Sequence, residues 1–292
     1  MAALAALSSA PAMAQDVLGH AAPGEISLQQ SVTPIMDSIT AFHNGLLIWI
    51  ISGITLFVLA LMVFVMVRFN RRANPTPNRF SHNTLVEVVW VVVPVIILLV
   101  IAAPSFAVLS DQLTVPDGQR KYLGPNIFSF GDVEVPAAEL TIKATGVQWY
   151  WDYAYPDLSE DSFSSVMLQN DERVSEKPDQ PRLLAVDNEL VVPVNTTVKV
   201  LVTSDPTGVI HAFAVPSFGI KIDAVPGRLN ETWFNVRKTG IYYGQCSELC
   251  GKDHAFMPIA VRVVEKDEFA RWIEAYKADG VDAANKTLSP VT

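Results

Sequence analysis

The sequence predicts two transmembrane α-helices in an N-terminal hairpin, followed by an exported all-β domain and one C-terminal helix. Three observations predict this fold class. Residues 41–67 and 88–109 are strongly apolar and contain no Asp, Glu, Lys or Arg. The region after residue 110 has several short stretches in which polar and apolar residues alternate. Near its end, both cysteines of the chain lie in the motif Cys-x3-Cys-x3-His-x2-Met.

The two apolar stretches are each longer than the ~20 residues that an α-helix needs to cross a bilayer. We therefore expect transmembrane helices at 41–67 and 85–109. Pro94 and Pro104 are tolerated in a membrane helix and should bend the second span. Buried helices of a large soluble core are the alternative interpretation.

The charge of the connecting loop predicts the orientation of the hairpin. The loop 68–84 contains no acidic residue, and short positive loops stay in the cytoplasm. Its basic residues are Arg68, Arg71, Arg72 and Arg79. We therefore expect a multi-pass membrane protein with the segment 16–40, the β domain and both termini on the outer side, which for a bacterial inner membrane is the periplasmic side.

The extreme N-terminus resembles the end of a secretory signal peptide. Small apolar residues lead to Ala12-Met13-Ala14, an A-x-A pattern of the kind that signal peptidase cleaves. We expect residues 1–15 to be removed, so that the mature chain begins near Gln15. An uncleaved, disordered tail is the alternative.

The exported domain, predicted at 110–266, is acidic and mostly β. The whole formal net charge of −9 lies after residue 110. Such a charge favours steering of a basic partner and argues against binding of nucleic acid or anionic lipid. The expected strands, separated by turn signals, suggest an antiparallel sandwich or barrel. They are 139–145, 196–203, 230–236 and 258–264.

Helical spacing of apolar residues returns after the last expected strand. With Asp267 as N-cap, the apolar residues Phe269, Trp272, Ile273 and Tyr276 would share one face of a helix at 267–278. A polar, disordered tail should follow at 279–292. The segment 117–139, between the second span and the first strand, has no role that the sequence indicates.

The cysteine motif allows a disulfide, a redox catalyst or a metal site. A disulfide is permitted in an exported domain, but a loop of so few residues would add little stability, and it would leave His254 and Met257 unexplained. Thiolate, imidazole and thioether donors together suit copper, since Met is rarely a zinc ligand. Apart from His254, the only histidine of the β region is His211. Two cysteines that can bridge imply two metal ions.

Taken together, the motifs resemble subunit II of aa3-type haem-copper cytochrome c oxidases, in the form found in alphaproteobacteria and mitochondria. The similarity runs from about residue 40 to 265. It is carried by "RFNRRANPTPNRFSHNT", "GVQWYWDYAYPD", "LLAVDNELVVPV", "VIHAFAVPSFGIKIDAVPGR" and "YYGQCSELCGKDHAFMPIAV". The resemblance implies that the β domain is a cupredoxin-like Greek-key barrel. It also implies a dinuclear copper centre, CuA, that accepts electrons from cytochrome c.

The resemblance further implies a role for each residue of the motif. Cys246 and Cys250 would bridge both coppers, and His211 and His254 would each bind one. Met257 would be a weak axial ligand. The backbone carbonyl of Glu248 would complete the set, with its side chain facing a magnesium or manganese ion shared with subunit I.

Outside the motif, the resemblance makes Trp149 the residue at which electrons enter. Asp157, Asp187 and Asp205 would belong to an acidic docking surface for cytochrome c. Two departures put that surface in doubt, because Ala154 and Gly208 stand where related chains often carry an acid.

Three further residues have implied roles away from the copper centre. Glu87 would lie at the cytoplasmic entrance of a proton pathway, although a Glu in the first turn of a helix is often only a cap. Asp223 and Arg228 would lie near subunit I, although charges that flank a Pro-Gly turn are often merely exposed to solvent.

The implied partners are cytochrome c, subunit I with haems a and a3 and CuB, subunit III, and membrane lipid. The chain would relay electrons to subunit I, which reduces oxygen to water while protons are pumped. A quinol oxidase subunit would lack the copper ligands, and nitrous oxide reductase lacks the two membrane helices. A thioredoxin-type copper chaperone would have one span and a βαβ pattern. A structural disulfide domain would leave the ligand set a coincidence.

Overall fold

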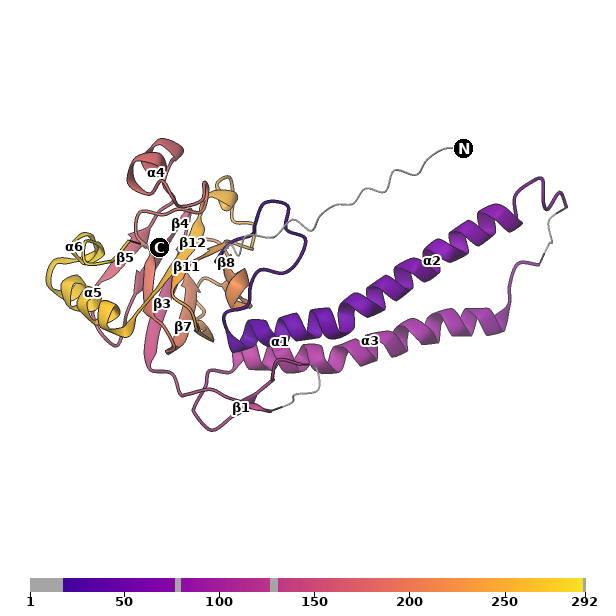
Figure 1. Cartoon of the computed structure of the whole chain (residues 1–292), viewed down its shortest axis with the longest axis horizontal. Coiled ribbons are helices and arrows are strands. Elements are labelled where there is room, and N and C mark those ends of the chain that lie inside the picture. Colours follow the sequence, from indigo (N-terminus) through magenta and orange to yellow (C-terminus); the bar gives the residue numbers. More distant parts are fainter. Residues whose placement is uncertain (1–17, 77–79, 127–130, 291–292) are drawn as a thin grey trace, which may run out of the picture.

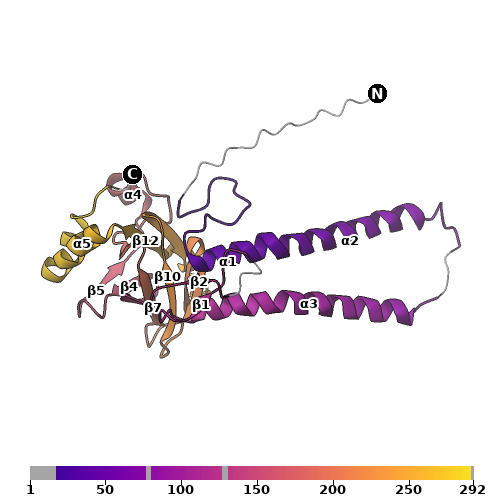
Figure 2. The ribbon, with the colours of Figure 1, turned by 60° about the horizontal axis from the view of Figure 1, so that its bottom comes forward.

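In this computed structural model, the described residues are 18–76, 80–126 and 131–290. Two long helices run side by side away from a β domain, as Figures 1 and 2 both show. The expected signal peptide at 1–15 and the loop residue Arg79 lie outside the described residues.

The helical hairpin is longer than the two apolar stretches alone. The first helix is continuous through α1 (Pro34–Phe42), the single π turn η1 (His43–Leu47) and α2 (Ile48–Arg68). The second helix is α3 (Thr84–Leu113), which contains both prolines. Both helices are long and apolar enough to cross a membrane, and the apolar side chains along them are exposed. These exposed apolar surfaces therefore need a lipid or protein cover.

The β domain is built from two larger sheets and two small antiparallel pairs. One sheet has the strand order β10-β7-β3-β4-β5 and the other β11-β12-β6, while β8 pairs with β9 and β1 with β2. The strands are β1 (Lys121–Tyr122), β2 (Val133–Glu134), β3 (Leu140–Val147), β4 (Tyr150–Ala154), β5 (Ser162–Ser165), β6 (Leu190–Pro193), β7 (Thr197–Ser204), β8 (His211–Val215), β9 (Ile220–Ala224), β10 (Asn230–Asn235), β11 (Gly240–Gln245) and β12 (Pro258–Val264).

All four strands expected from the sequence are present, as β3, β7, β10 and β12. The expectation of a purely antiparallel domain is wrong, however. Strand β3 pairs with β7, and β12 with β6, in parallel. Each parallel pair is joined by a long connection that passes through other strands, which parallel pairing requires and alternation cannot reveal. Residues of both larger sheets share one hydrophobic core.

The C-terminal helix α5 (Lys266–Asp279) packs an aromatic face against this core. Trp272 and Tyr276 are buried and stacked, with ring centroids 5.3 Å apart. Asp267 is not the N-cap, since Glu265 holds that position and Asp267 pairs with Arg271 in the first turn.

The chain after α5 is more ordered than the expected disordered tail. It forms one more short helix, α6 (Val281–Asn285), with Ala284 buried in the core. The side chain of Asn285 accepts a hydrogen bond from the indole of Trp272 at 3.1 Å. The remaining short helices of the chain are α4 (Asn170–Glu176), η2 (Pro216–Phe218) and η3 (His254–Phe256).

Residues 18–37, which precede the first membrane helix, are fastened across the β domain. The amide of Tyr243 on β11 donates to the carbonyl of Gly19 at 2.8 Å. A Cβ at Gly19 would lie 1.9 Å from the carbonyl oxygen of Ile241, so only glycine fits there. Further along, the hydroxyl of Thr33 donates to Phe218, and Asp37 forms a two-pronged ion pair with Arg237.

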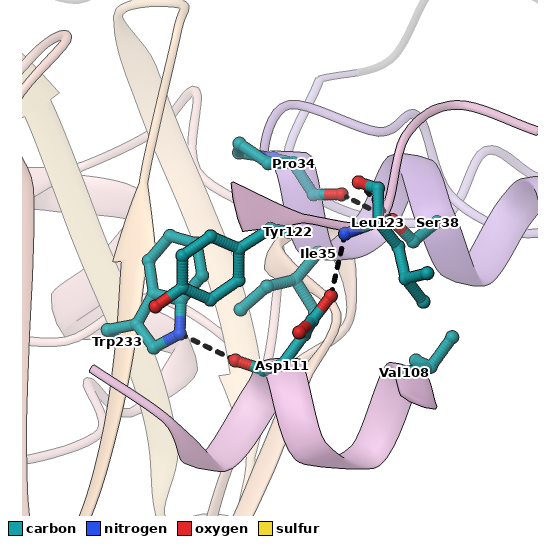
Figure 3. A pocket seen from close by; sticks show the side chains of 8 residues that line it. All are labelled: Pro34, Ile35, Ser38, Val108, Asp111, Tyr122, Leu123 and Trp233. Atoms are coloured by element: carbon teal, nitrogen blue, oxygen red, sulfur yellow. Dashed lines mark hydrogen bonds between the residues drawn. The ribbon is translucent and has the colours of Figure 1, made fainter. Parts of the chain in front are cut away.

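The end of α3 meets the β domain at a buried carboxylate, Asp111 (Figure 3). Its side chain accepts the amide of Leu123 at 2.7 Å and pairs with Arg120 at 2.9 Å. Its backbone carbonyl accepts the indole N–H of Trp233 on β10 at 2.7 Å. Tyr122 packs its ring on Trp233, with centroids 5.0 Å apart. The helix end is therefore tied to the core through both its side chain and its main chain.

The segment 117–139 thus has a structural role that the sequence did not indicate. Its described part forms the β1–β2 pair and places Arg120, Tyr122 and Leu123 at the junction. The hydroxyl of Ser38 on α1 donates to the carbonyl of Leu123 at 3.1 Å, so the segment contacts both helices. This arrangement fixes the β domain relative to the hairpin.

We expect Asp111→Asn to lower the free energy of unfolding of the detergent-solubilised chain by about 1–3 kcal/mol, because it leaves Arg120 without its carboxylate at a partly buried site. Thermal unfolding of the full chain measures the change. Glu134→Gln is the matched control, since it removes the exposed pair with Lys121 in the same segment and should leave the midpoint unchanged. Equal midpoints for all three proteins would show that the junction adds no stability.

Candidate metal centre

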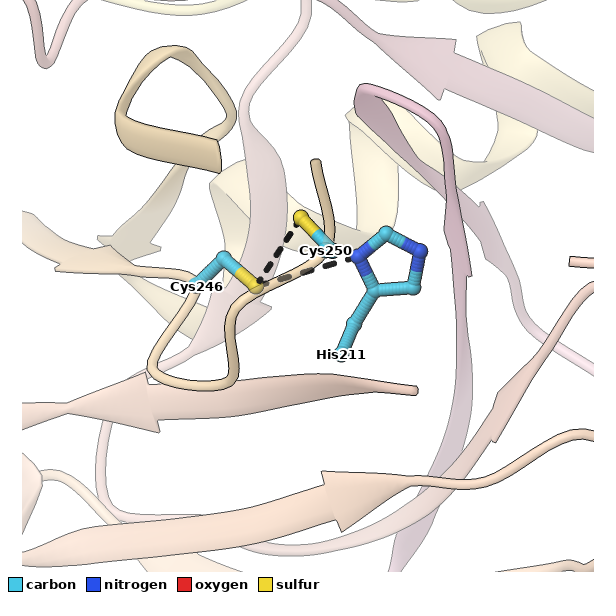
Figure 4. Close-up of side chains that lie close together, drawn as sticks. All are labelled: His211, Cys246 and Cys250. Atoms are coloured by element: carbon cyan, nitrogen blue, oxygen red, sulfur yellow. Dashed lines mark hydrogen bonds between the residues drawn. The ribbon is translucent and has the colours of Figure 1, made fainter. Parts of the chain in front are cut away.

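The five candidate ligand side chains come from one strand and one loop. His211 begins β8, and the loop between β11 and β12 supplies Cys246, Cys250, His254 and Met257. Opposite His211, a Cβ at position 146 would lie 2.8 Å from the imidazole, so Gly146 of β3 makes room for the ring. Figure 4 shows His211 facing both cysteines.

The donor atoms form two connected groups. In the first, Sγ of Cys246 lies 3.7 Å from Nδ1 of His211 and 3.3 Å from the carbonyl oxygen of Glu248. In the second, Sγ of Cys250 lies 3.5 Å from Nδ1 of His254 and 3.6 Å from Sδ of Met257. The two sulfur atoms, both free thiols, are 3.9 Å apart and join the groups.

The centre is deeply buried, which controls its protonation. His211 is fully buried, Cys246, Cys250 and Met257 nearly so, and His254 lies at the rim. Burial, and next the neighbouring Cys246 thiol, raises the pKa of Cys250 to about 12. Burial also lowers the pKa of His211, with the charge of His254 as the smaller cause. Without a cation the Cys250 thiol therefore keeps its proton at neutral pH, and a metal ion would have to displace that proton.

Two tryptophans of the β4 region hold the ligand loop in place. The indole N–H of Trp149 donates to the carbonyl of Cys250 at 3.1 Å, and that of Trp151 to the carbonyl of Met257 at 3.3 Å. The side-chain amide of Gln148 donates to the same Cys250 carbonyl at 2.9 Å. The loop is thus fixed at its middle and at its C-terminal end, as an outer shell of a metal site requires.

The donor set fits a pair of soft metal ions. Nδ1, Sγ and Sδ atoms converge, and the ligand atoms of His211, Cys246 and Cys250 all lie within 4.8 Å of one another. Nε2 of His211 is buried and has no partner among the described residues, so the ring presents Nδ1 to the sulfurs. Each sulfur has one imidazole and one weak donor beside it, which is the arrangement that two thiolate-linked copper ions would use.

The charged residues expected at the interface with subunit I lie near the loop. Glu248 is half exposed, and its carboxylate lies 3.2 Å from the ammonium of Lys221, which is also 3.6 Å from Asp223. Arg228 is exposed in the turn between β9 and β10. The structure thus brings the carboxylates of Glu248 and Asp223 to the same ammonium group, that of Lys221.

The three expected docking acids do not form a cluster of free carboxylates. Asp157 is exposed in the turn after β4. The carboxylate of Asp205 accepts the amide and the hydroxyl of Thr207, both at 2.7 Å. Asp187 is half-buried, and its Oδ1 accepts the backbone N–H groups of Val166 and Asn188, both at 2.7 Å.

Several residues of the site were missed in the sequence. Gln148 and Trp151 lie on either side of Trp149 in the motif "GVQWYWDYAYPD", but the family resemblance assigned a role to Trp149 alone. The ammonium of Lys252 lies 5.4 Å from the centre of the Trp149 ring. Its position two residues after Cys250 was the available signal, but a cation next to an acid, Asp253, is ordinary in any surface loop.

Two membrane-length helices, a β domain and a buried Cys-His-Met cluster that could hold a metal define the class: a membrane protein with a candidate metal centre. Comparison with known families then identifies the family to which the chain belongs. The periplasmic domain of cytochrome c oxidase subunit II matches residues 140–264, and its transmembrane domain matches residues 21–108. The junction segment 117–139 lies between the matched ranges.

Individual relatives agree with the family matches. A probable cytochrome c oxidase subunit 2 of Rickettsia bellii is 48% identical, over 91% of this chain and 90% of the relative. The cytochrome c oxidase subunit 2 of Cereibacter sphaeroides is 40% identical, over 93% and 87%. A crystal structure of the periplasmic domain of subunit II of Bradyrhizobium japonicum cytochrome oxidase is 61% identical, covers 53% of this chain and 99% of its own, and has a TM-score of 0.44.

The chain therefore belongs to the cytochrome c oxidase subunit II family and is a subunit of that enzyme. Its β domain has the cupredoxin-like fold of the family, and association with subunit I follows from membership. The quinol oxidase, chaperone and structural alternatives are thereby set aside.

Burial raises the pKa of Asp187, so the folded state binds its proton more tightly than the unfolded state does. The stability that this proton provides is present at low pH and is lost as the pH rises through the raised pKa. In Asp187→Asn, Oδ1 can still accept both N–H groups. We expect the variant to match wild type near pH 3 and to be more stable at about pH 7.

Denaturant unfolding at several pH values measures this difference. Asp205→Asn is a control of opposite sign, because the hydrogen bonds of Thr207 lower the pKa of Asp205. Its stability relative to wild type should fall as the pH rises. A pH-independent difference for Asp187→Asn would contradict the effect of burial.

Proposed function

We propose that this chain accepts electrons from cytochrome c at a dinuclear copper centre, CuA, and relays them to the haems of subunit I. The observation that supports it best is the division of the donors into two groups, each with one sulfur, one imidazole Nδ1 and one weak donor, joined across 3.9 Å between the sulfurs. Oxygen would then be reduced to water in subunit I, with proton pumping by the whole enzyme.

In this proposal the ligands are His211, Cys246, Cys250, His254, Met257 and the carbonyl of Glu248. The bound pair of copper ions would supply a one-electron centre whose charge is shared through both thiolates. The protein would contribute rigidity. His211 is locked between Gly146 and the ring of Trp151, and the loop carbonyls are held by indole N–H groups. Burial excludes water from the donors, so little would reorganise around a change of charge.

Trp149 is the proposed point at which electrons enter. Its half-buried ring is linked to the Cys250 carbonyl by a single hydrogen bond. The path from the indole to the Cys250 sulfur is therefore one hydrogen bond followed by the covalent atoms of one residue. A donor that contacts the exposed part of this ring would therefore reach the centre by a short path.

We also propose the finer interface roles expected from the family. The Glu248 carboxylate would hold a magnesium or manganese ion shared with subunit I, and the ion would displace the ammonium of Lys221. Asp223 and Arg228 would face subunit I at the same edge. Asp157, Asp187 and Asp205 would contribute negative potential to cytochrome c docking, although two of these carboxylates also hold their own loops.

The hairpin supports a proposed orientation. Arg68, Arg71 and Arg72 are exposed at the end of the hairpin far from the β domain (Figure 1), as a cytoplasmic loop would require. The β domain would then be periplasmic. Glu87 lies at that same far end, where its carboxylate accepts a hydrogen bond from the amide of Asn83 at 3.0 Å and so caps α3. In this orientation Glu87 would also lie at the cytoplasmic entrance of the proton pathway. Lipid and subunits I and III would cover the apolar helices.

Copper loading of the full chain, expressed in membranes and extracted in detergent, tests the centre. We expect two coppers per chain and a seven-line electron paramagnetic resonance pattern, because one electron would be shared by two equivalent nuclei. Cys246→Ser should bind at most one copper, since it removes a bridge, whereas its neighbour variant Ser247→Ala should behave as wild type. A four-line, single-copper spectrum from the wild-type chain would refute the dinuclear proposal.

The role of Trp149 is tested in the assembled oxidase by Trp149→Phe. The phenyl ring can still pack on the loop but cannot donate to the Cys250 carbonyl. We expect stopped-flow electron transfer from cytochrome c to slow by about an order of magnitude, with copper content unchanged. Tyr150→Phe, a conservative change next in the chain, should not slow it. Equal rates for both variants would place the point of electron input elsewhere.

A further inference from the structure

One buried tryptophan touches both donor groups of the candidate metal centre. The side chain of Trp151 on β4 is fully buried. Its indole N–H donates to the carbonyl of Met257, in the second donor group, at 3.3 Å. Its ring meets the imidazole of His211, in the first donor group, edge-on with centroids 6.1 Å apart. Trp151 therefore contacts one candidate ligand from each group.

The register of β3 and β4 explains how this side chain reaches the imidazole. Trp151 lies directly opposite Gly146 in the antiparallel pair, so both residues face the same side of the sheet. A Cβ at position 146 would lie 2.8 Å from Cδ2 of His211, so the imidazole fills the room that glycine leaves. The ring of Phe213 on β8 packs edge-on against the indole, with centroids 5.4 Å apart. Since Trp151, His211 and Phe213 are all fully buried, the indole is held by packing that excludes water.

Other contacts hold the donors, but each acts on one part of the centre. The amide of Ser247 donates to the carbonyl of Ala212 at 3.3 Å, which ties the start of the ligand loop to the strand that carries the imidazole. In the second donor group, the Cys250 carbonyl accepts the side-chain N–H groups of Gln148 and Trp149. The buried indole differs from these contacts because it spans the two donor groups.

We propose that Trp151 is a positioning residue that keeps the two donor groups equivalent, so that one electron is shared evenly by both metal ions. This inference rests on the proposed function, because it takes the centre to be a copper pair. Even sharing requires two sites of matching energy. A thioether is the weak, long ligand of such copper sites, so a small shift of the loop at Met257 would unbalance the pair. Trp151 prevents that shift by holding the Met257 carbonyl while its ring supports the imidazole of the other group.

Trp151→Phe tests the proposal, because it removes the N–H and keeps an aromatic ring in the core. In the copper-loaded full chain, extracted in detergent, we expect two coppers per chain, as in wild type. The electron paramagnetic resonance spectrum should lose the seven-line pattern of two equivalent nuclei. The metal-free variant should also unfold at a lower temperature, because the buried carbonyl of Met257 loses its donor.

Trp272→Phe is the matched control. Trp272 is also fully buried, and its indole N–H donates to Asn285 at 3.1 Å, while its ring stacks on Tyr276 of α5 and not on a candidate ligand. Thermal unfolding of the metal-free chain should show a loss of stability for this variant too, but its copper-loaded form should keep the seven lines. A seven-line pattern in Trp151→Phe, or loss of the pattern in both variants, would overturn the proposal.

Phe213→Leu provides a second test that does not depend on the folding of Trp151→Phe. It removes the ring that packs on the indole but leaves the N–H and every candidate ligand in place. We expect broadened hyperfine lines, and a spectrum identical to that of wild type would count against the role of Trp151. A wild-type chain without seven lines would refute the copper pair and this inference together. Seven lines in wild type and in both Trp151→Phe and Phe213→Leu would refute the inference alone.

Discussion

The burial of a fully enclosed imidazole beside two thiols is the constraint on which the rest of the domain depends. Polar groups in a dry core need partners, and here Nδ1 of His211 and the two thiols lie against one another, while Nε2 of His211 has no partner among the described residues. The surrounding residues limit the movement of the imidazole and of the ligand loop. Gly146 packs directly against the His211 ring, and tryptophan N–H groups hold the loop carbonyls of Cys250 and Met257. A rigid set of soft donors is what a metal ion would find favourable to enter.

Buried polar groups are also paired where the β domain meets the end of α3. Asp111 uses its carboxylate for the chain that follows α3 and its carbonyl for Trp233 of the core. A helix end in contact with a folded domain must satisfy its last carbonyls, and here a tryptophan of the β10 strand does so. The orientation of the ligand loop relative to the helical hairpin is therefore fixed by buried contacts and does not depend on a flexible linker.

Local patterns predicted much of this. Alternation located β3, β7, β10 and β12, and the spacing of Cys246, Cys250, His254 and Met257 within one loop was legible because those residues are neighbours in the chain. What could not be read depends on distant partners: the parallel pairing of β3 with β7, the ordered α6, and the junction built by Arg120 and Tyr122. The sequence alone does not show the surroundings of Lys252 or Asp187. Only the fold shows that Lys252 lies over the Trp149 ring and that the carboxylate of Asp187 is turned toward its own backbone.

The segment 18–37 has a consequence for biogenesis. It is synthesised some two hundred residues before the groups that it binds, among them the amide of Tyr243 and the side chain of Arg237. At ~5–20 residues per second, the early piece must wait many seconds with its hydrogen-bonding groups unpaired, while the hairpin enters the bilayer. Closure of the N-terminal segment over β11 is then a late event in folding, because it requires the finished β domain.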